Sequence, residues 1–185
     1  GVSRETWAVK AVVDGQNREF SIRRDLPGGA VQPYPLRLEF DTYWLLRGTA
    51  VPIAEPLWYE DDPDQLLDGR EFYVRDRVEG HWDVPGFESQ GPEFDVLRKA
   101  ISQEHLSQLA NVHMLDWQSL GFGELFEAPR SPSTAADDRI DQLEGLLRSF
   151  QIEPLPAVTE SLEWLRDNAP TDAPCICLCK GTNGR

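Results

Sequence analysis

The residues with the most evident chemistry are a basic and an acidic side chain on two neighbouring predicted elements. Arg23 stands in Glu19–Arg24, which has the composition of a strand, and Glu39 stands in Leu36–Leu46, which has helical spacing. A carboxylate that pairs with a guanidinium can position the cation for a bound anion. On the residues alone, however, such a pair is most simply a surface ion pair that contributes little.

The chain has three cysteines, and they stand close together at Cys175, Cys177 and Cys179. An odd, tightly clustered set argues against a disulfide framework and for a reducing compartment, so we expect a cytoplasmic protein. A metal site needs at least a fourth ligand and usually wider spacing. Because Ile176 and Leu178 alternate with the cysteines, Pro174–Cys179 is expected to be a strand with its sulfurs buried on one face. Metal or redox chemistry is the less favoured alternative.

Composition and charge limit the classes of function. Of the 185 residues, 40% are hydrophobic and 27% are charged, as in an ordinary globular protein. No apolar run reaches the roughly 18 residues of a membrane span, and no secretory signal opens the sequence. The formal charge of −14 is uneven, because residues 1–50 carry seven Lys and Arg against six Asp and Glu, and residues 51–185 carry 11 against 26. We expect neither nucleic acid nor membrane as a partner; the acidity attracts cations or simply aids solubility.

The first part of the chain has the pattern of a small sheet with one helix. The segments expected to be extended are Thr6–Val13, Glu19–Arg24, Pro52–Tyr59 and Glu71–Val78. Asp14–Asn17 is a turn cluster, so the first two strands should form an antiparallel hairpin. Leu36–Leu46 is expected to be a helix that ends near Gly48. The order is therefore strand, strand, helix, strand, strand.

The second part is predicted to be helical and begins after a linker over His81–Pro92. The expected helices are Phe94–Leu115, which has one apolar face, Asp138–Phe150 and Val158–Asn168. Thr159 is a candidate cap for the last of them. The whole pattern predicts an α+β fold with two lobes: residues 1–80 as a small antiparallel β lobe with one helix, and residues 81–185 as a larger, mainly helical lobe.

Several strings, in this order along the chain, resemble the aminoglycoside-phosphotransferase-like family, which has a protein-kinase-like fold. Gly1-Val2-Ser3-Arg4-Glu5-Thr6-Trp7 resembles the family's Gly/Ser loop and the strand after it. The loop's backbone N–H groups approach nucleotide phosphates, so the resemblance implies that role for Gly1 and Ser3. It also implies a first strand upstream of Gly1.

The candidate ion pair falls on two further matches to this family. Phe20–Asp25 resembles the third strand of the kinase fold, where Lys usually holds the α- and β-phosphates and where this chain has Arg23. Glu39 matches the helix Glu that pairs with this basic residue. With the order of elements added, the resemblance favours a nucleotide-binding role for both residues over a surface ion pair.

The segment Glu71–Gly80 resembles the strand and hinge between the two kinase lobes. In that family backbone groups hold the adenine, which here implies Asp76 and Val78. Apolar side chains such as Val51 and Val74 are expected to flank the ring.

The most specific string is Leu109–Trp117 followed by Leu120-Gly121, which resembles the family's "Leu-His, Asp-Trp, Leu-Gly" string. We expect His113 to be structural, packed at the end of a core helix, and not catalytic. Leu162–Pro170 resembles the helix before the catalytic strand.

The resemblance fails at the catalytic loop. The family reads His-Gly-Asp there, then four residues, then Asn, where Asp is the base and Asn binds Mg²⁺. This chain reads Lys180-Gly181-Thr182, so Lys180 falls at the His and Thr182 at the Asp. A threonine hydroxyl cannot act as a base near neutral pH. We expect no metal ligand in this chain, which looks truncated at this loop, and Mg²⁺ ligands beyond Arg185.

The resemblance implies a transferase that moves the γ-phosphate of ATP, with Mg²⁺, to a hydroxyl of a small and possibly cationic substrate. A divergent enzyme whose base comes from elsewhere is one explanation of Thr182. The alternative is a catalytically weak, pseudokinase-like protein that only binds nucleotide. A protein built on cysteine metal or redox chemistry ranks last.

Overall fold

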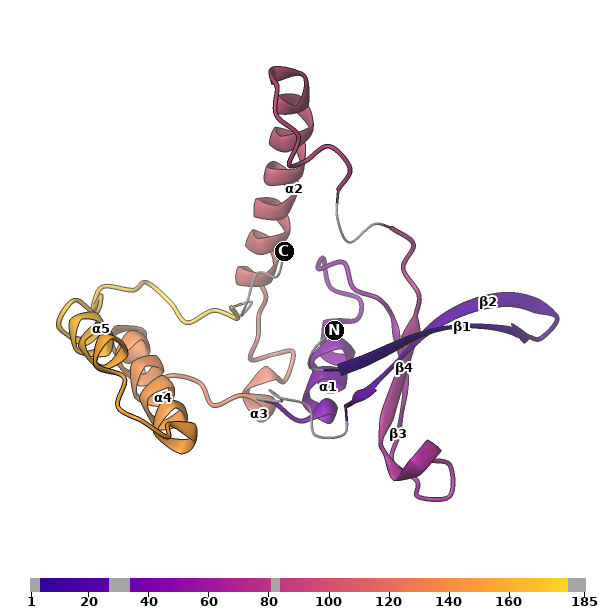
Figure 1. The fold of residues 1–185 in the computed structure, drawn as a ribbon, viewed down its shortest axis with the longest axis horizontal. Coiled ribbons are helices and arrows are strands. Elements are labelled where there is room, and N and C mark those ends of the chain that lie inside the picture. Colours follow the sequence, from indigo (N-terminus) through magenta and orange to yellow (C-terminus); the bar gives the residue numbers. More distant parts are fainter. Residues whose placement is uncertain (1–3, 27–33, 81–83, 180–185) are drawn as a thin grey trace. The chain divides into compact units, whose positions relative to one another are not determined.

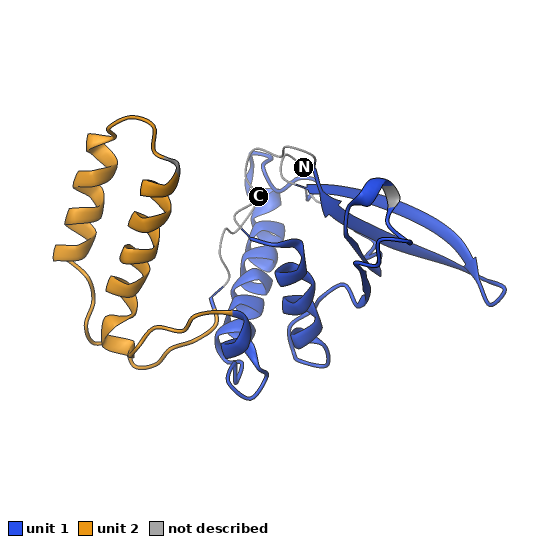
Figure 2. Ribbon diagram, turned by 90° about the horizontal axis from the view of Figure 1, so that it is seen from below, with its two compact units in different colours: residues 1–125, 179–185 blue, residues 126–178 orange. Residues whose placement is uncertain are grey.

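The computed structural model describes residues 4–26, 34–80 and 84–179 and divides into two compact units (Figure 2). Among the described residues, the larger unit runs up to Leu125 and includes Cys179, and the smaller unit runs from Phe126 to Leu178. The larger unit holds the sheet and the side chains that form the candidate site.

Four strands form one antiparallel sheet in the larger unit (Figure 1). In spatial order they are β1 (Arg4–Val13), β2 (Gln16–Asp25), β4 (Phe72–Asp76) and β3 (Pro56–Glu60). The β1–β2 hairpin turns through Asp14 and Gly15, whose φ angles are 51° and 77°. Two central residues with positive φ are the backbone of a type I′ turn, which matches the twist of paired strands. The predicted hairpin is confirmed.

Helix α1 (Leu36–Leu46) lies against one face of this sheet and builds the core of the larger unit (Figure 1). Phe40 is buried there with Tyr73 of β4, and Tyr59 of β3 packs against them. The ring centroid of Phe40 lies 5.6 Å from that of Tyr59 and 5.7 Å from that of Tyr73. The helix has the bounds that the apolar spacing predicts.

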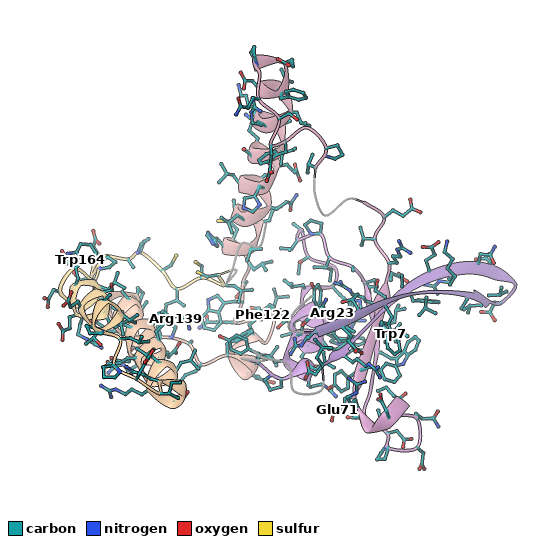
Figure 3. The ribbon with its side chains drawn as sticks, viewed as in Figure 1. Trp7, Arg23, Glu71, Phe122, Arg139 and Trp164 are labelled. Carbon is teal, nitrogen blue, oxygen red and sulfur yellow. The ribbon has the colours of Figure 1, made fainter. Side chains whose placement is uncertain are left out.

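The opposite face of the sheet is an open apolar groove of about 600 Å³. Its lining includes Val9, Phe20, Trp58 and Val74, one from each strand. Successive side chains of a strand point to opposite faces, so Trp7 lies on the groove side while Arg23 lies on the α1 side (Figure 3). The sheet therefore separates an apolar face from a charged one.

Two further helices complete the larger unit after the short 3₁₀ turns η1 (Leu67–Gly69) and η2 (Pro92–Phe94). They are α2 (Asp95–His113) and α3 (Phe122–Leu125). Phe122 is buried where α3 packs beside α1. No described side chain of α2 is fully buried, and His113 is exposed. The prediction that His113 packs at the end of a core helix is wrong, because an apolar stripe becomes core only where another element covers it.

The smaller unit is a helical hairpin that follows the turn η3 (Pro132–Thr134). Its helices, α4 (Ala135–Phe150) and α5 (Pro156–Asp167), lie side by side (Figure 2). Arg166 joins them through Asp141, at 2.8 Å, and Glu144, at 3.1 Å. The prediction that Thr159 caps the second helix is wrong. The helix begins earlier, at Pro156, and a proline is tolerated there because the first helical residue needs no N–H donor. Thr159 lies inside the helix, and its hydroxyl donates a hydrogen bond to the Leu155 carbonyl oxygen.

The segment Pro174–Cys179 is not a strand, which contradicts the prediction from alternating apolar residues. Cys175 and Cys179 are exposed and Cys177 is partly buried, so the sulfurs are not buried along one strand face. Alternation gives a segment the right pattern for a strand, but ladder hydrogen bonds need a neighbouring strand. Among the described helices, none is both long and apolar enough to cross a membrane.

Candidate functional site

Glu39 is the centre of a charged cluster on the α1 face of the sheet. Its Oε1 lies 2.8 Å from Nε of Arg23 and accepts a hydrogen bond of 2.6 Å from the Tyr73 hydroxyl. Its Oε2 accepts a hydrogen bond from Nη1 of Arg4. The sequence predicts that Arg23 and Glu39 meet, and the structure brings them together.

The register of the sheet puts these side chains on one face. Arg23 pairs with Thr6 of β1 on one side and with Tyr73 of β4 on the other. Directly paired residues of antiparallel strands share a face, with Cβ atoms roughly 5 Å apart. Glu39 reaches this row from the first turn of α1, one residue before the buried Phe40. Packing of the helix therefore carries the carboxylate to the arginine.

Arg23 keeps donor capacity that the protein does not use fully. Its Nη1 donates to the Thr6 hydroxyl at 2.9 Å. Its Nε is buried, and although Glu39 Oε1 is close, the N–H does not point at that oxygen or at any other described acceptor. The contact is an ion pair without an aligned hydrogen bond. Because the side chain is 23% exposed, an anion can approach the guanidinium from solvent.

The electrostatics of the cluster keep Glu39 charged. Burial by itself would raise its pKa, but the Tyr73 hydroxyl and the guanidinium groups of Arg23 and Arg4 outweigh burial and hold the pKa below its usual range. Burial and the neighbouring Glu39 carboxylate together raise the pKa of Tyr73, so this hydroxyl stays a donor. Burial lowers the pKa of Arg4, but its bonds to Asp25 and Glu39 outweigh this and raise it.

Replacing Glu39 by glutamine should make the protein less stable at pH 7, and the difference from wild type should shrink as the pH falls below the unfolded pKa of about 4.3. The folded pKa of Glu39 is lower than its unfolded value of about 4.3, so its contribution is complete above that pH and is lost as the pH falls through the folded pKa. Loss of about 1 kcal/mol lowers the Tm by roughly 2–4 °C in a chain of this size.

Thermal unfolding of Glu39→Gln and wild type at pH 7 and pH 3.5 measures this difference. Glu55→Gln is the matched control, because Glu55 is exposed and lies 4.0 Å from Arg47, and its Tm should match wild type at both pH values. A Tm gap for Glu39→Gln that is the same at both pH values would show that the carboxylate charge is not what stabilises the cluster.

The predicted hinge is only partly available for a ligand. The backbone N–H of Asp76 donates to the Glu55 carbonyl oxygen at 2.9 Å, and its side chain accepts from Arg18 at 2.9 Å. Val78 lies beyond the end of β4 and is exposed. Val74 is buried and lies on the groove side of the sheet, whereas Arg23 lies on the α1 side, and its role as a flank of the adenine ring stays a prediction.

The remaining predicted site residues are Gly1, Ser3, Lys180 and Thr182, and they lie outside the described residues. Their roles stay predictions. Three members of the cluster were missed by the sequence reading: Arg4, Thr6 and Tyr73. A signal for two of them existed, because a two-residue turn at Asp14 and Gly15 fixes which β1 residues oppose Arg23 and Asp25.

The string around Asp116 has a local structural role in the turn between α2 and α3. The Asp116 carboxylate accepts hydrogen bonds from the Ser119 backbone N–H, at 3.1 Å, and from its hydroxyl, at 2.7 Å. These bonds hold the pKa of Asp116 below its usual range. Gly121, with a φ of 87°, then lets the chain enter α3, where Phe122 is buried.

Comparison with known proteins gives a match in structure. No protein-family model matches the sequence, and no curated protein matches it. The chain resembles the crystal structure of a protein from Ralstonia eutropha JMP134 that is provisionally named an aminoglycoside phosphotransferase, with a TM-score of 0.61 and 24% identity. The likeness is one of fold. It covers 90% of this chain and 47% of the Ralstonia protein, so the chain spans about half the length of that protein.

Proposed function

We propose that this chain is the nucleotide-binding part of an ATP- and Mg²⁺-dependent phosphotransferase that acts on a hydroxyl of a small molecule. The observation that carries the proposal is Arg23, a strand arginine held by the helix carboxylate Glu39 with a buried Nε–H that no described acceptor satisfies. Such a guanidinium suits a phosphate, which accepts several N–H donors at once. The shared fold with the Ralstonia protein supports the same class of activity.

The residues of this chain divide the proposed binding between them. Arg23 would hold the phosphates, with Gly1 and Ser3 beside them. Since the N–H of Asp76 is already bonded to Glu55, the adenine would depend on backbone groups nearer Val78. ATP would supply the γ-phosphoryl group, and bound Mg²⁺ would neutralise charge on the phosphates.

No described residue is assigned to Mg²⁺. The carboxylates of Glu39 and Asp25 are both bonded to Arg4, so they are poor candidates for metal ligands. The acidic excess after residue 50 favours a cationic acceptor such as an amino alcohol. The oxygen of the acceptor hydroxyl would bond the γ-phosphorus while the bond from that phosphorus to the β,γ-bridging oxygen breaks and ADP leaves, and the hydroxyl proton would pass to a base.

A nucleotide-binding protein without transfer activity is the second candidate. The specific observation in its favour is Thr182, which stands where the resembled family has a carboxylate base. ATP consumption over a panel of hydroxylated amines separates the two candidates. Turnover that depends on the amine supports the enzyme, and nucleotide binding without turnover supports the binding protein.

Thermal unfolding with and without nucleotide tests the proposal itself. At an ATP concentration 100 times Kd, binding stabilises the folded state by about 2.7 kcal/mol, which raises the Tm by roughly 5–10 °C. Adenosine is the control ligand, because it has no phosphate for Arg23 and should give a much smaller shift. Absence of a shift with ATP or ADP, with or without Mg²⁺, would contradict both candidates.

A further inference from the structure

Arg4 is a partly buried arginine whose three donor nitrogens are all used within the protein. Its side chain is 11% exposed. Nε donates to Asp25 at 2.7 Å, Nη1 donates to Glu39, and Nη2 donates to the Tyr34 carbonyl oxygen at 2.5 Å. These acceptors come from the end of β2, from α1 and from the residues just before α1. Arg4 thus joins the first residue of β1 to the element that carries Glu39.

Arg4 and Arg23 share one carboxylate but use it differently. Arg4 bonds Oε2 of Glu39, while Arg23 and Tyr73 contact Oε1. Arginine and a carboxylate prefer a bidentate pair in which two N–H groups meet two oxygens. Arg4 and the Tyr73 hydroxyl occupy Glu39 in a way that prevents this pair from forming with Arg23. This explains why Nε of Arg23 is near Oε1 without being aligned to it.

We propose that Arg4 is a positioning residue that keeps Glu39 from closing a bidentate pair with Arg23, and so leaves the Arg23 guanidinium available to a nucleotide phosphate. The inference rests on the proposed function, since it assigns Arg23 to the phosphates. Without Arg4, the Glu39 carboxylate loses the partner of Oε2 and turns towards Arg23. The donors that Arg23 would offer to phosphate are then used within the protein.

A double-mutant cycle on the 185-residue chain tests this proposal, with ADP affinity measured by calorimetry. The variants are Arg4→Ala, Arg23→Ala and the double variant. Arg4→Ala should weaken ADP binding about tenfold when Arg23 is present, the size expected for one lost charge-assisted hydrogen bond, and less than twofold in the Arg23→Ala background. A purely structural role would give the same loss in both backgrounds and would overturn the proposal.

Two further variants keep the result interpretable. Arg4→Lys keeps a positive charge beside Glu39, so its ADP affinity should lie between those of wild type and Arg4→Ala. It replaces Arg4→Ala in the cycle if that variant does not fold. Arg70→Ala is the matched control, because Arg70, like Arg4, donates to Asp25, here to the backbone oxygen at 2.9 Å, but pairs with Asp68 at 2.7 Å and has no described contact with Glu39. Its ADP affinity should equal that of wild type.

The outcomes separate this inference from the proposed function. If the wild-type chain binds no ADP, the proposed function fails and the inference fails with it. If wild type binds ADP and neither Arg4→Ala nor Arg4→Lys changes its affinity, only the inference fails.

Discussion

Replacing Phe40 by alanine should lower the free energy of unfolding by about 3–5 kcal/mol, the largest stability loss that we expect from one substitution in this chain. Phe40 is 6% exposed and its ring meets those of Tyr59 and Tyr73. Alanine removes the ring and leaves a cavity between α1 and the sheet that the paired strands cannot fill. In a chain of this length the Tm should fall by roughly 6–20 °C.

Urea unfolding followed by circular dichroism measures this loss. Trp44→Ala is the matched control, because Trp44 is also an aromatic residue of α1, one turn further on, but is 40% exposed. Its replacement should cost about 1 kcal/mol or less. Equal losses for the two variants would show that α1 is not anchored to the sheet through Phe40. Phe40→Leu should lie between them, since it retains much of the apolar volume.

The region around α1 was predictable because its local signals agree with its packing. The turn residues Asp14 and Gly15 permit the positive φ angles that a two-residue hairpin needs. The apolar spacing of α1 matches the face that Phe40 buries. The meeting of Arg23 and Glu39 was predicted only when the order of elements was added, because a charged pair has no local pattern of its own.

The rest of the cluster needed the strand register. Nothing in the sequence next to Arg4 indicates that it contacts Glu39. Its pairing with Asp25 across the hairpin places it near α1. Once the hairpin is read as a two-residue turn, that pairing follows from the sequence. Tyr73 is different, because 46 residues separate the end of β2 from the start of β4. No local signal in the sequence sets the register between these two strands.

Two of the wrong predictions share one physical cause. Alternation in Pro174–Cys179 and the apolar stripe of α2 are both local patterns, and each needs a second element to become a strand or a core face. A single segment does not specify that partner.

Replacing Arg23 by alanine should weaken ADP and ATP binding by about 10- to 100-fold, while the Tm without nucleotide changes by no more than about 2 °C. The affinity falls because the phosphate loses a charge-assisted interaction with a guanidinium, which is worth about 1.5–3 kcal/mol. The fold should tolerate the change because Glu39 still accepts hydrogen bonds from Arg4 and Tyr73. Binding and stability are thus separable at this position.

Calorimetric titration with ADP and thermal unfolding of the ligand-free protein measure the two effects. Arg37→Ala is the control, because Arg37 is an exposed arginine of the neighbouring helix whose partners are Asp41 and Asp61, and it should bind ADP like wild type. Arg23→Lys keeps the charge but not the bidentate geometry, so its affinity should lie between those of wild type and Arg23→Ala. Full ADP affinity in Arg23→Ala would show that Arg23 does not bind the phosphates. If the Tm of this variant also fell by much more than 2 °C, Arg23 would have a structural role instead.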